Sequence, residues 1–456
     1  MTSNLAPFPK QSIIIITSAT NGMSYMIFDR DLLEKIRAEF PRASTDLNGR
    51  KRAFFDNGTG TLVVRRAARA EAEARVDCSA NVEGVFDESR KADEVILEGR
   101  TAVADLLNAP SPDNIILGES ATSLFFNLSY AMSKDLTGRQ NAVLTEYEHY
   151  ANISPWVELK ERGKLREVRF ARLKADDGTL DMEHLKSLID EETRIVSVSA
   201  ASNALGTKSP LEEIRSMAKE VGAYFVVDAV HHVAHGPIDV EKQGCDFLIF
   251  SGYKLFAPHG SFLYGRSEHL EDLRPYKVKP AHNVSPVKWE WGTRDQAKFA
   301  AIKGAIDHLA WLGEQVRGKY GGEFNTYSER KRTLKISMDA IEKYELELSK
   351  AVVSGLDGLK GLSELPGVRI YGLTDLKRFG ERDPTFSFKV RNKSDLEVVS
   401  RLWSEGVASR SEDFYSRALE SYGEKAMIRI SLVHYNSIEE VALFLKVMNQ
   451  ICACGP

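Results

Sequence analysis

The central part of the chain, from about residue 90 to 265, alternates short apolar runs with stretches of helical periodicity. The apolar runs are rich in β-branched and aromatic residues, which predicts strands buried on both faces of a sheet. The stretches between them, such as 211–221, space their apolar residues for amphipathic helices. This alternation predicts an α/β fold with a mostly parallel sheet covered by crossover helices. The expected strands are 114–117, 141–145, 194–200, 224–227, 246–250 and 261–264.

A second pattern begins after Gly292, where long charged helical stretches replace the alternation. Residues 323–356 predict one or two helices that connect a large domain to a smaller one. The rest of the chain mixes expected strands at 385–390 and 428–432 with an expected helix at 438–451. The sequence therefore predicts an α+β domain at the C-terminal end.

The composition narrows the class of protein. Of 456 residues, 43% are hydrophobic and 28% are charged, as in ordinary globular proteins. The net charge of −4 gives no electrostatic reason to expect nucleic acid, and no apolar run reaches the roughly 20 residues that cross a bilayer. The apolar run at 13–16 makes a weak signal peptide at best. We therefore expect no membrane and no nucleic-acid partner.

The cysteines indicate a reducing compartment. Their number is far too small for a disulfide framework in a chain of this length; they are Cys78, Cys245, Cys452 and Cys454. We therefore expect a cytoplasmic protein. The last two cysteines could bind a metal or carry sulfur, but a two-thiol tail this close to a terminus is more often unstructured.

Lys254 follows a strongly apolar strand and a Ser-Gly turn, in the segment 246–254 (DFLIFSGYK). In open α/β sheets, ligands bind beyond the carboxyl ends of strands, so this lysine places an amine in the expected pocket. A free lysine, with a pKa near ~10.4, is a poor nucleophile at neutral pH, but desolvation or imine formation with an aldehyde removes that obstacle. Taken alone, Lys254 is more simply a surface lysine.

Two other expected strands also end in polar residues. Asp228 ends the run 224–228 (YFVVD), where a buried carboxylate needs a charged or hydrogen-bonding partner. A pyridinium nitrogen is such a partner, because the carboxylate keeps it protonated and the ring can then withdraw electrons from a carbanion. The alternative for Asp228 is a helix N-cap. Asn203 ends a third strand, where its amide could reach a phenolic oxygen.

A phosphate site is expected at 117–123 (LGESATS), between a short strand and the helical run 124–132. Free amides and hydroxyls at a helix N-terminus favour an anion. Hydroxyls there are often only caps, but together with Lys254 and Asp228 the phosphate interpretation is favoured. The glycines of 58–60 (GTG) match no nucleotide-binding motif, because the lysine and the third glycine are missing.

Five motifs, in this order, resemble the class V aminotransferase family, and most closely its cysteine-desulfurase-like branch. They are 145–152 (TEYEHYAN), 202–206 (SNALG), 227–231 (VDAVH), 251–254 (SGYK) and 292–293 (GT). The resemblance covers most of the chain, from Phe54 to Asn436. It implies fold type I of the transferases that depend on pyridoxal 5′-phosphate (PLP). That fold has a large PLP-binding domain with a mostly parallel seven-stranded sheet and a smaller α+β C-terminal domain.

The resemblance also places the domain bounds. We expect the large domain at 46–320 and the small domain at 321–456. The N-terminal segment 1–45 is expected to pack with the small domain.

The resemblance implies a role for each matching residue. Lys254 would hold PLP as a Schiff base, Asp228 would partner the pyridine nitrogen, and His149 would stack on the ring and take part in catalysis. The other implied cofactor contacts are Ala121, Thr122, Ser123, Asn203, His231, Ser251, Tyr253 and Thr293. Thr293 would reach the phosphate of a neighbouring subunit, which implies a homodimer. Arg429 would bind the substrate carboxylate through its planar fork of donors, with Arg410 and Asn203 as further substrate contacts.

Three close histidines, His231, His232 and His235, could be interpreted as a metal cluster. Because they follow Asp228 directly in the chain, cofactor contact or ordinary packing is the better interpretation, and we expect no metal.

The loop 410–415 (RSEDFY) departs from the family pattern. Desulfurases that pass sulfur onward carry a nucleophilic cysteine here, whereas Tyr415 occupies the matching position. We therefore expect an amino-acid lyase that acts through an external aldimine, by carbon–sulfur cleavage of a cysteine derivative without a loop persulfide. Transamination and epimerisation or racemisation are the alternatives. A non-catalytic PLP-binding protein is disfavoured, because a carrier has no need of Arg429.

Overall fold

The large domain is built on one sheet of seven strands. The computed structural model describes residues 26–453; the run at 13–16 and Cys454 lie outside the described residues. The strand order is β2-β8-β7-β6-β5-β3-β4. Only β8 runs antiparallel to its neighbours, β2 and β7, and the other pairs are parallel. The strands are β2 (Ile115–Gly118), β3 (Asn141–Thr145), β4 (Glu167–Ala171), β5 (Thr193–Ser199), β6 (Tyr224–Asp228), β7 (Phe247–Ser251) and β8 (Ser261–Gly265). The predicted α/β fold with a mostly parallel sheet is confirmed.

Strand β4 was missing from the six strands expected from the apolar pattern. It lies at the edge of the sheet, next to β3 alone, and most of its side chains are only half-buried. Arg169 at its centre pairs with Asp190 at 2.7 Å. An edge strand needs no continuous apolar run. Because β4 contains charged residues, the search for apolar runs did not identify it as a strand.

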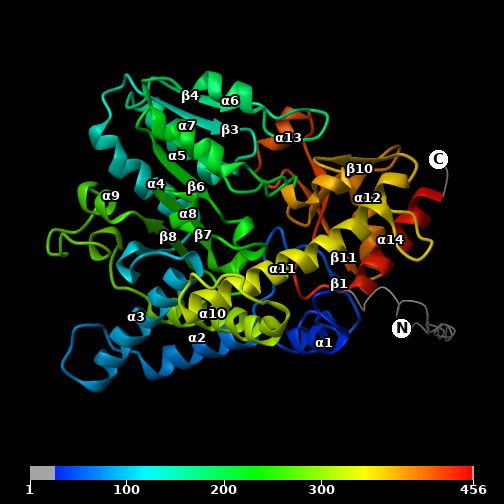
Figure 1. Ribbon diagram of the computed structural model, residues 1–456, viewed down its shortest axis with the longest axis horizontal. Helices are drawn as coiled ribbons and strands as arrows, with labels where there is room; N and C mark the ends of the chain where they lie inside the picture. Colours follow the sequence, from blue (N-terminus) through cyan, green and yellow to red (C-terminus); the bar gives the residue numbers. More distant parts are fainter. Residues whose placement is uncertain (1–25, 454–456) are drawn as a thin grey trace, which may run out of the picture.

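Helices cover both faces of this sheet (Figure 1). Along β7, Phe247 and Ile249 belong to one buried cluster, and Leu248 and Phe250 to another, because successive side chains of a strand point to opposite faces. Helices α4 and α5 supply the first cluster, and α3, α7 and α10 supply the second. The helices of this part are α2 (Arg65–Asp77), α3 (Asp87–Leu107), α4 (Ala121–Met132), α5 (Tyr150–Glu161), α6 (Met182–Leu188), α7 (Leu211–Glu220), α8 (Val240–Gln243), α9 (Ser267–Asp272) and α10 (Gln296–Val316).

The small domain contains a four-stranded antiparallel sheet in the order β12-β13-β10-β9. Its strands are β9 (Val368–Tyr371), β10 (Thr385–Val390), β12 (Arg410–Glu412) and β13 (Met427–Ser431). Its helices are α12 (Asp395–Ser404), α13 (Ala418–Ser421) and α14 (Ile438–Ala453). The predicted strands and the terminal helix of this part are therefore present.

The first described helix, α1 (Arg30–Ala38), is attached to the small domain. Arg37 donates to the Tyr435 carbonyl at 2.6 Å and pairs with Glu440 at 2.7 Å. Nearby, β1 (Ala53–Phe54) runs parallel to β11 (Val407–Ala408). The domain bounds themselves stay predictions.

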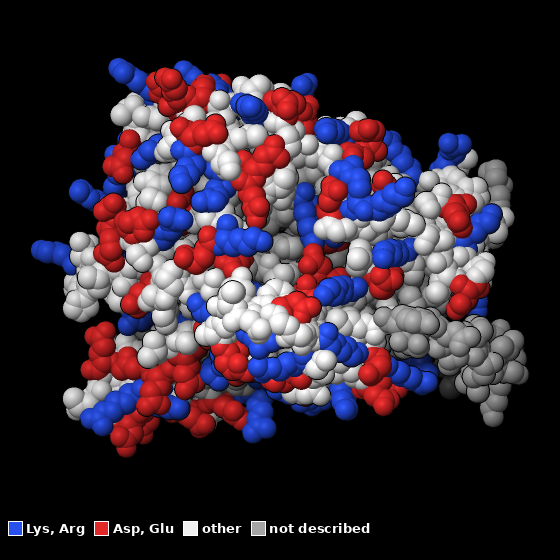
Figure 2. Space-filling model, viewed as in Figure 1, with Lys and Arg blue, Asp and Glu red and all other residues white. Residues whose placement is uncertain are grey.

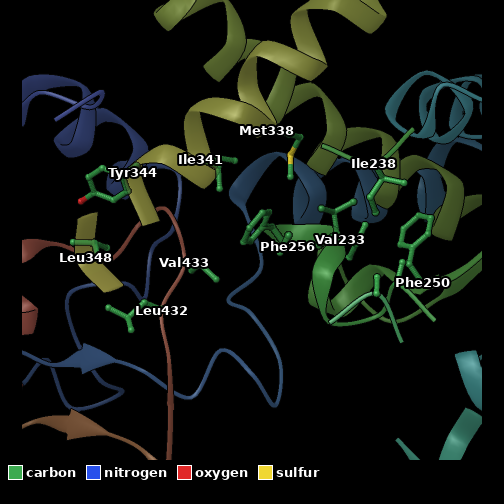
Figure 3. Packing of buried hydrophobic residues seen from close by; sticks show 14 of the residues in the cluster. Val233, Ile238, Phe250, Phe256, Met338, Ile341, Tyr344, Leu348, Leu432 and Val433 are labelled. Atoms are coloured by element: carbon green, nitrogen blue, oxygen red, sulfur yellow. The ribbon is translucent and has the colours of Figure 1, made fainter. Parts of the chain in front are cut away.

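One long helix, α11 (Glu329–Ser354), joins the two domains. Figure 3 shows Met338 on the side of Val233 and Phe256, while Leu348 lies toward Leu432. All of them belong to one buried cluster. The predicted connection is thus a single helix, and its apolar face fixes one domain against the other.

Basic and acidic side chains are interspersed on the face of the molecule seen in Figure 2, and neither sign of charge forms a large patch there. In residues 26–453, no helix is long and apolar enough to span a bilayer. The mixed surface agrees with the small net charge of the chain.

Candidate active site

A cavity of about 610 Å³ lies where the large-domain strands end and the small domain begins. This is within the usual size of ligand pockets, roughly 300–1,000 Å³. It brings together residues that are far apart in the sequence. The predicted site residues that line it are Ala121, Thr122, His149, Asn203, Asp228, His231, Ser251, Tyr253, Lys254 and Arg429.

Three predicted residues lie elsewhere. Ser123 lines no part of this cavity and exchanges hydrogen bonds with Ser120 at the start of α4. The guanidinium of Arg410 donates two hydrogen bonds to Oδ2 of Asp56, from Nε at 3.0 Å and from Nη2 at 2.9 Å. Thr293 lines a separate surface hollow. Their proposed contacts with cofactor or substrate stay predictions.

Lys254 is buried at the end of β7, in the 3-10 turn η5 (Gly252–Lys254). Its amine donates to the carbonyl of Gly58. The pKa of this amine is lowered to about 7, mainly by burial and next by the charge of Arg429, whereas Asp56 and Asp228 act in the opposite direction. A large fraction of the amine is therefore unprotonated and nucleophilic at neutral pH.

This pKa predicts how fast the cofactor-free protein takes up PLP. Only the unprotonated amine of Lys254 attacks an aldehyde, so the rate of imine formation should rise with pH up to about 7 and then level off. Stopped-flow absorbance of apoprotein mixed with PLP measures this rate. A rate that keeps rising toward pH ~10, as for an ordinary lysine, would contradict the environment described for Lys254.

Asp228 ends β6 beside Lys254. One of its carboxylate oxygens accepts the N–H of Val230 at 2.9 Å. The pKa of Asp228 is raised to about 7, mainly by burial, with the charge of the nearby Glu148 acting in the same direction. Among the described residues, no cation lies within ion-pair distance of this carboxylate. A pyridinium nitrogen would supply the missing positive charge.

Glu148 lies beneath the cavity and is completely buried. Its two oxygens accept four hydrogen bonds, which come from Thr145, Asn152 and both the amide and the hydroxyl of Ser199. Ser199 pairs directly with Asp228 across the sheet. Glu148 thus joins three of the structural elements that position the site.

Two further features fit PLP. The Oδ1 atom of Asn203 is buried without a hydrogen-bond partner in the described part of the chain, and a phenolic hydroxyl would satisfy it. At the N-terminus of α4, the first amides lack partners within the helix, and the hydroxyl of Thr122 lines the cavity. Such a helix end binds phosphate. Together with Lys254 and Asp228, these groups match an aldehyde, a pyridine ring and a phosphate.

His149 is the N-cap of α5. Its Nδ1 accepts the N–H of Ala151 at 3.0 Å, so the neutral ring must carry its proton on Nε2. Burial lowers the pKa of His149 to about 4, helped by the charges of Lys254 and Arg429. The ring is therefore neutral near pH 7 and offers Nε2–H as a donor.

Arg429 on β13 is the cation of the small domain that lines the cavity. It donates to the carbonyl of Asn203 at 2.9 Å and to the hydroxyl of Thr59 at 2.8 Å. Burial lowers the pKa of Arg429 to about 10, so it remains charged at neutral pH. A Cβ on Gly58 would lie 2.9 Å from the guanidinium carbon, so a larger residue there would displace the Arg429 side chain. In the described residues no carboxylate forms an ion pair with Arg429, which leaves it free for a substrate carboxylate.

The three histidines near Asp228 take separate partners. His231 lines the cavity and contacts Thr385 at 3.1 Å. His232 pairs with Asp383 at 3.0 Å, and His235 pairs with Glu345 at 2.8 Å. Ligand atoms of His231, His235 and Asp383 lie within 4.8 Å of one another. These partners explain the grouping as polar packing of the segment 231–235 against α11 and the small domain, and the expectation of no metal stays a prediction.

No individual role was assigned from the sequence to several lining residues: Thr59, Ser120, Phe126, Tyr150, Glu412 and Phe414. Thr59 lies in the glycine-containing segment that was set aside as matching no nucleotide motif. Its hydroxyl holds Arg429, a contact over 370 residues of chain that no local pattern reveals. Glu412 and Phe414 belong to the loop of Tyr415, so the departure of that loop from the family pattern was their only signal.

The fold and the groups that line the cavity define a PLP-dependent enzyme of fold type I. The family model of class V aminotransferases ("Aminotransferase class-V") matches residues 53–444. The chain belongs to this family.

Relatives and solved structures agree with this assignment. A probable cysteine desulfurase of Synechocystis is 30% identical over 91% of this chain and 94% of its own length. A cysteine desulfurase of Pectobacterium atrosepticum is 29% identical over 90% of this chain and 95% of its own length. The apo structure of a cysteine desulfurase from Thermococcus onnurineus superposes with a TM-score of 0.77 at 25% identity, covering 92% of this chain and 98% of that one. The predicted resemblance and the PLP dependence are confirmed.

Proposed function

We propose that the protein is a lyase that cleaves the carbon–sulfur bond of a cysteine derivative by β-elimination, without passing sulfur to a loop cysteine. The curated relatives are cysteine desulfurases, which supports chemistry at this bond. One observation carries the difference from them: Tyr415 lines the cavity in the loop where a sulfur acceptor would be expected. In residues 26–453, none of the cysteines lines this cavity.

The site residues divide the work of this reaction. PLP, when bound, supplies an aldehyde for the substrate amine and a ring that withdraws electrons from the α carbon. Arg429 binds the carboxylate and orients the substrate. Lys254, whose pKa is about 7, takes the α proton as general base. His149 donates an Nε2–H hydrogen bond to the departing sulfur, because its Nδ1 is occupied by the Ala151 amide, and the Lys254 ammonium then gives its proton to that sulfur.

Transamination and epimerisation use the same groups, so product analysis must separate the three reactions. With S-methyl-L-cysteine and no 2-oxo acid, the account predicts pyruvate, ammonia and methanethiol in equal amounts. Lactate dehydrogenase coupling detects the pyruvate. Product formation that depends strictly on an added 2-oxo acid would establish an aminotransferase. Loss of optical rotation without pyruvate would establish a racemase.

We further propose a homodimer in which Thr293 reaches the neighbouring active site. Thr293 lines a hollow beside the exposed side chains of Tyr276, Val278 and Trp291. These apolar side chains are 56%, 63% and 57% exposed, and such patches mark protein interfaces. The proposal adds a contact from the neighbouring subunit to the phosphate site at the N-terminus of α4.

The dimer predicts a clear effect of Trp291→Asp. A buried charge at the interface should convert the dimer to monomers at micromolar concentration and weaken PLP binding, because Thr293 of the neighbour is lost. Light scattering after size exclusion, together with PLP titration, measures both effects. Leu396→Asp, at a 73% exposed position on α12, is the control and should leave the dimer intact. A wild-type protein that is monomeric at these concentrations would refute the dimer.

A further inference from the structure

The loop that carries Phe414 and Tyr415 has an unusual backbone. Both residues have positive φ angles, 55° and 49°. Bulky residues rarely adopt this left-handed conformation because their Cβ atoms approach the backbone too closely. Such strain persists only where the surroundings impose it, and it concentrates at functional sites. The loop is therefore held in its place by contacts.

Three of those contacts join the loop to the elements of the active site. The carbonyl of Phe414 accepts from the Asn203 side chain at 2.9 Å. The carbonyl of Tyr415 accepts from the N–H of Tyr150 at 2.8 Å, and the N–H of Arg417 donates to the Glu148 carbonyl at 3.0 Å. The loop is thus hydrogen-bonded to the segment that carries His149 and to Asn203, which lines the cavity.

The two aromatic rings then take different places. Phe414 is buried, and the guanidinium of Arg429 lies 3.9 Å from its ring centre, so it belongs to the carboxylate end of the cavity. Tyr415 is 66% exposed although it lines the cavity. Its ring stacks beside His149, with 5.9 Å between ring centres and 29° between ring planes. It therefore lies next to the donor that serves the departing sulfur.

Tyr150 completes this end of the cavity. It is 37% exposed, lines the cavity, and its hydroxyl bonds to Glu420 of α13. Tyr150 and Tyr415 thus both line the cavity with partly exposed aromatic side chains, and Tyr415 stacks beside His149. Two partly exposed aromatic side chains in the wall of the cavity that holds His149 can bind a group beyond the sulfur atom.

We propose that Tyr150 and Tyr415 form an aromatic subsite that binds the substituent on the substrate sulfur, and that the enzyme prefers cysteine S-conjugates with a flat aromatic substituent. This inference rests on the proposed lyase function and adds its substrate class. The reaction needs no redox partner. Lys254 takes the α proton, the Cβ–S bond breaks with its electron pair on sulfur, and the Lys254 ammonium passes that proton to the thiolate. The Nε2–H of the neutral His149 donates a hydrogen bond to the departing sulfur. The remaining aminoacrylate takes up water and gives pyruvate and ammonia.

The holoenzyme tests this with two matched substrates, S-benzyl-L-cysteine and S-methyl-L-cysteine. Stacking on two aromatic rings should raise kcat/KM for the benzyl compound at least about tenfold above the methyl compound. Pyruvate release measures turnover. A titration of the cofactor absorbance measures binding, and does so whether or not elimination follows. Equal or weaker binding and turnover of the benzyl compound would overturn the subsite.

Variants assign the preference to the ring of Tyr415. Tyr415→Phe keeps the ring and should keep the preference, whereas Tyr415→Leu should reduce the benzyl-to-methyl ratio at least about fivefold. Trp403→Leu, which changes an exposed aromatic residue outside the cavity, is the matched control and should leave the ratio unchanged. An unchanged ratio in Tyr415→Leu would also overturn the assignment.

The same measurements separate this inference from the lyase proposal. Tight binding of S-benzyl-L-cysteine without release of pyruvate would contradict the proposed β-elimination but support the aromatic subsite. Release of pyruvate from both compounds at equal kcat/KM would support the proposed β-elimination and contradict the aromatic subsite.

Discussion

Replacing Lys254 with alanine is expected to abolish covalent attachment of PLP and to lower turnover by at least about 10³-fold, because one side chain serves both as imine partner and as general base. Asp228 and the N-terminus of α4 would remain, so the variant should still bind PLP without a covalent bond. The measurements are pyruvate release and the cofactor absorbance spectrum.

The control for this variant is Lys343→Ala, which removes an exposed lysine of α11 and should retain activity. A small primary amine added to Lys254→Ala should restore part of the lost turnover, because it replaces the missing base. If Lys254→Ala kept wild-type turnover, the role given to Lys254 would be wrong.

Replacing Arg429 with glutamine is expected to lower kcat/KM by roughly 30- to 3,000-fold. Truncating one partner of a buried, hydrogen-bonded charge pair costs about 2–5 kcal/mol, and each 1.4 kcal/mol is about tenfold. The buried guanidinium is pre-positioned by Asn203 and Thr59, so glutamine replaces neither the charge nor the fork of donors. Steady-state kinetics with S-methyl-L-cysteine should show most of the loss as a higher KM.

Arg410→Gln is the informative comparison for Arg429→Gln. Arg410 is half-exposed and engaged by Asp56, and such exposed ion pairs contribute only about 0–1 kcal/mol. We therefore expect less than about a fivefold loss of kcat/KM from this variant. A loss as large as that of Arg429→Gln would give Arg410 the carboxylate contact that the sequence also allowed.

The residues at strand ends were predictable because parallel topology forces them together. Lys254, Asp228 and Asn203 follow three different strands, and the carboxyl ends of parallel strands meet at one edge of a sheet. The apolar runs that identify those strands are continuous, since both faces are buried. The large-domain half of the site could therefore be placed from the sequence.

The half of the site that the small domain contributes was harder to predict from the sequence. Arg429 was placed by family resemblance, but its neighbours Thr59 and Phe414 come from opposite ends of the chain. Helical or strand periodicity in a sequence does not predict contacts between residues so far apart in the chain. Strand β4 was missed for a related reason, because an edge strand tolerates charges. The strained backbone of Tyr415 likewise becomes visible only in three dimensions.

The most direct test of the account is to reduce the PLP-loaded protein with borohydride and to map the modified peptide by mass spectrometry. The account predicts one pyridoxyl group per chain, on the peptide that contains Lys254. A pyridoxyl group on another lysine, or no stable adduct in a protein that binds PLP, would contradict it.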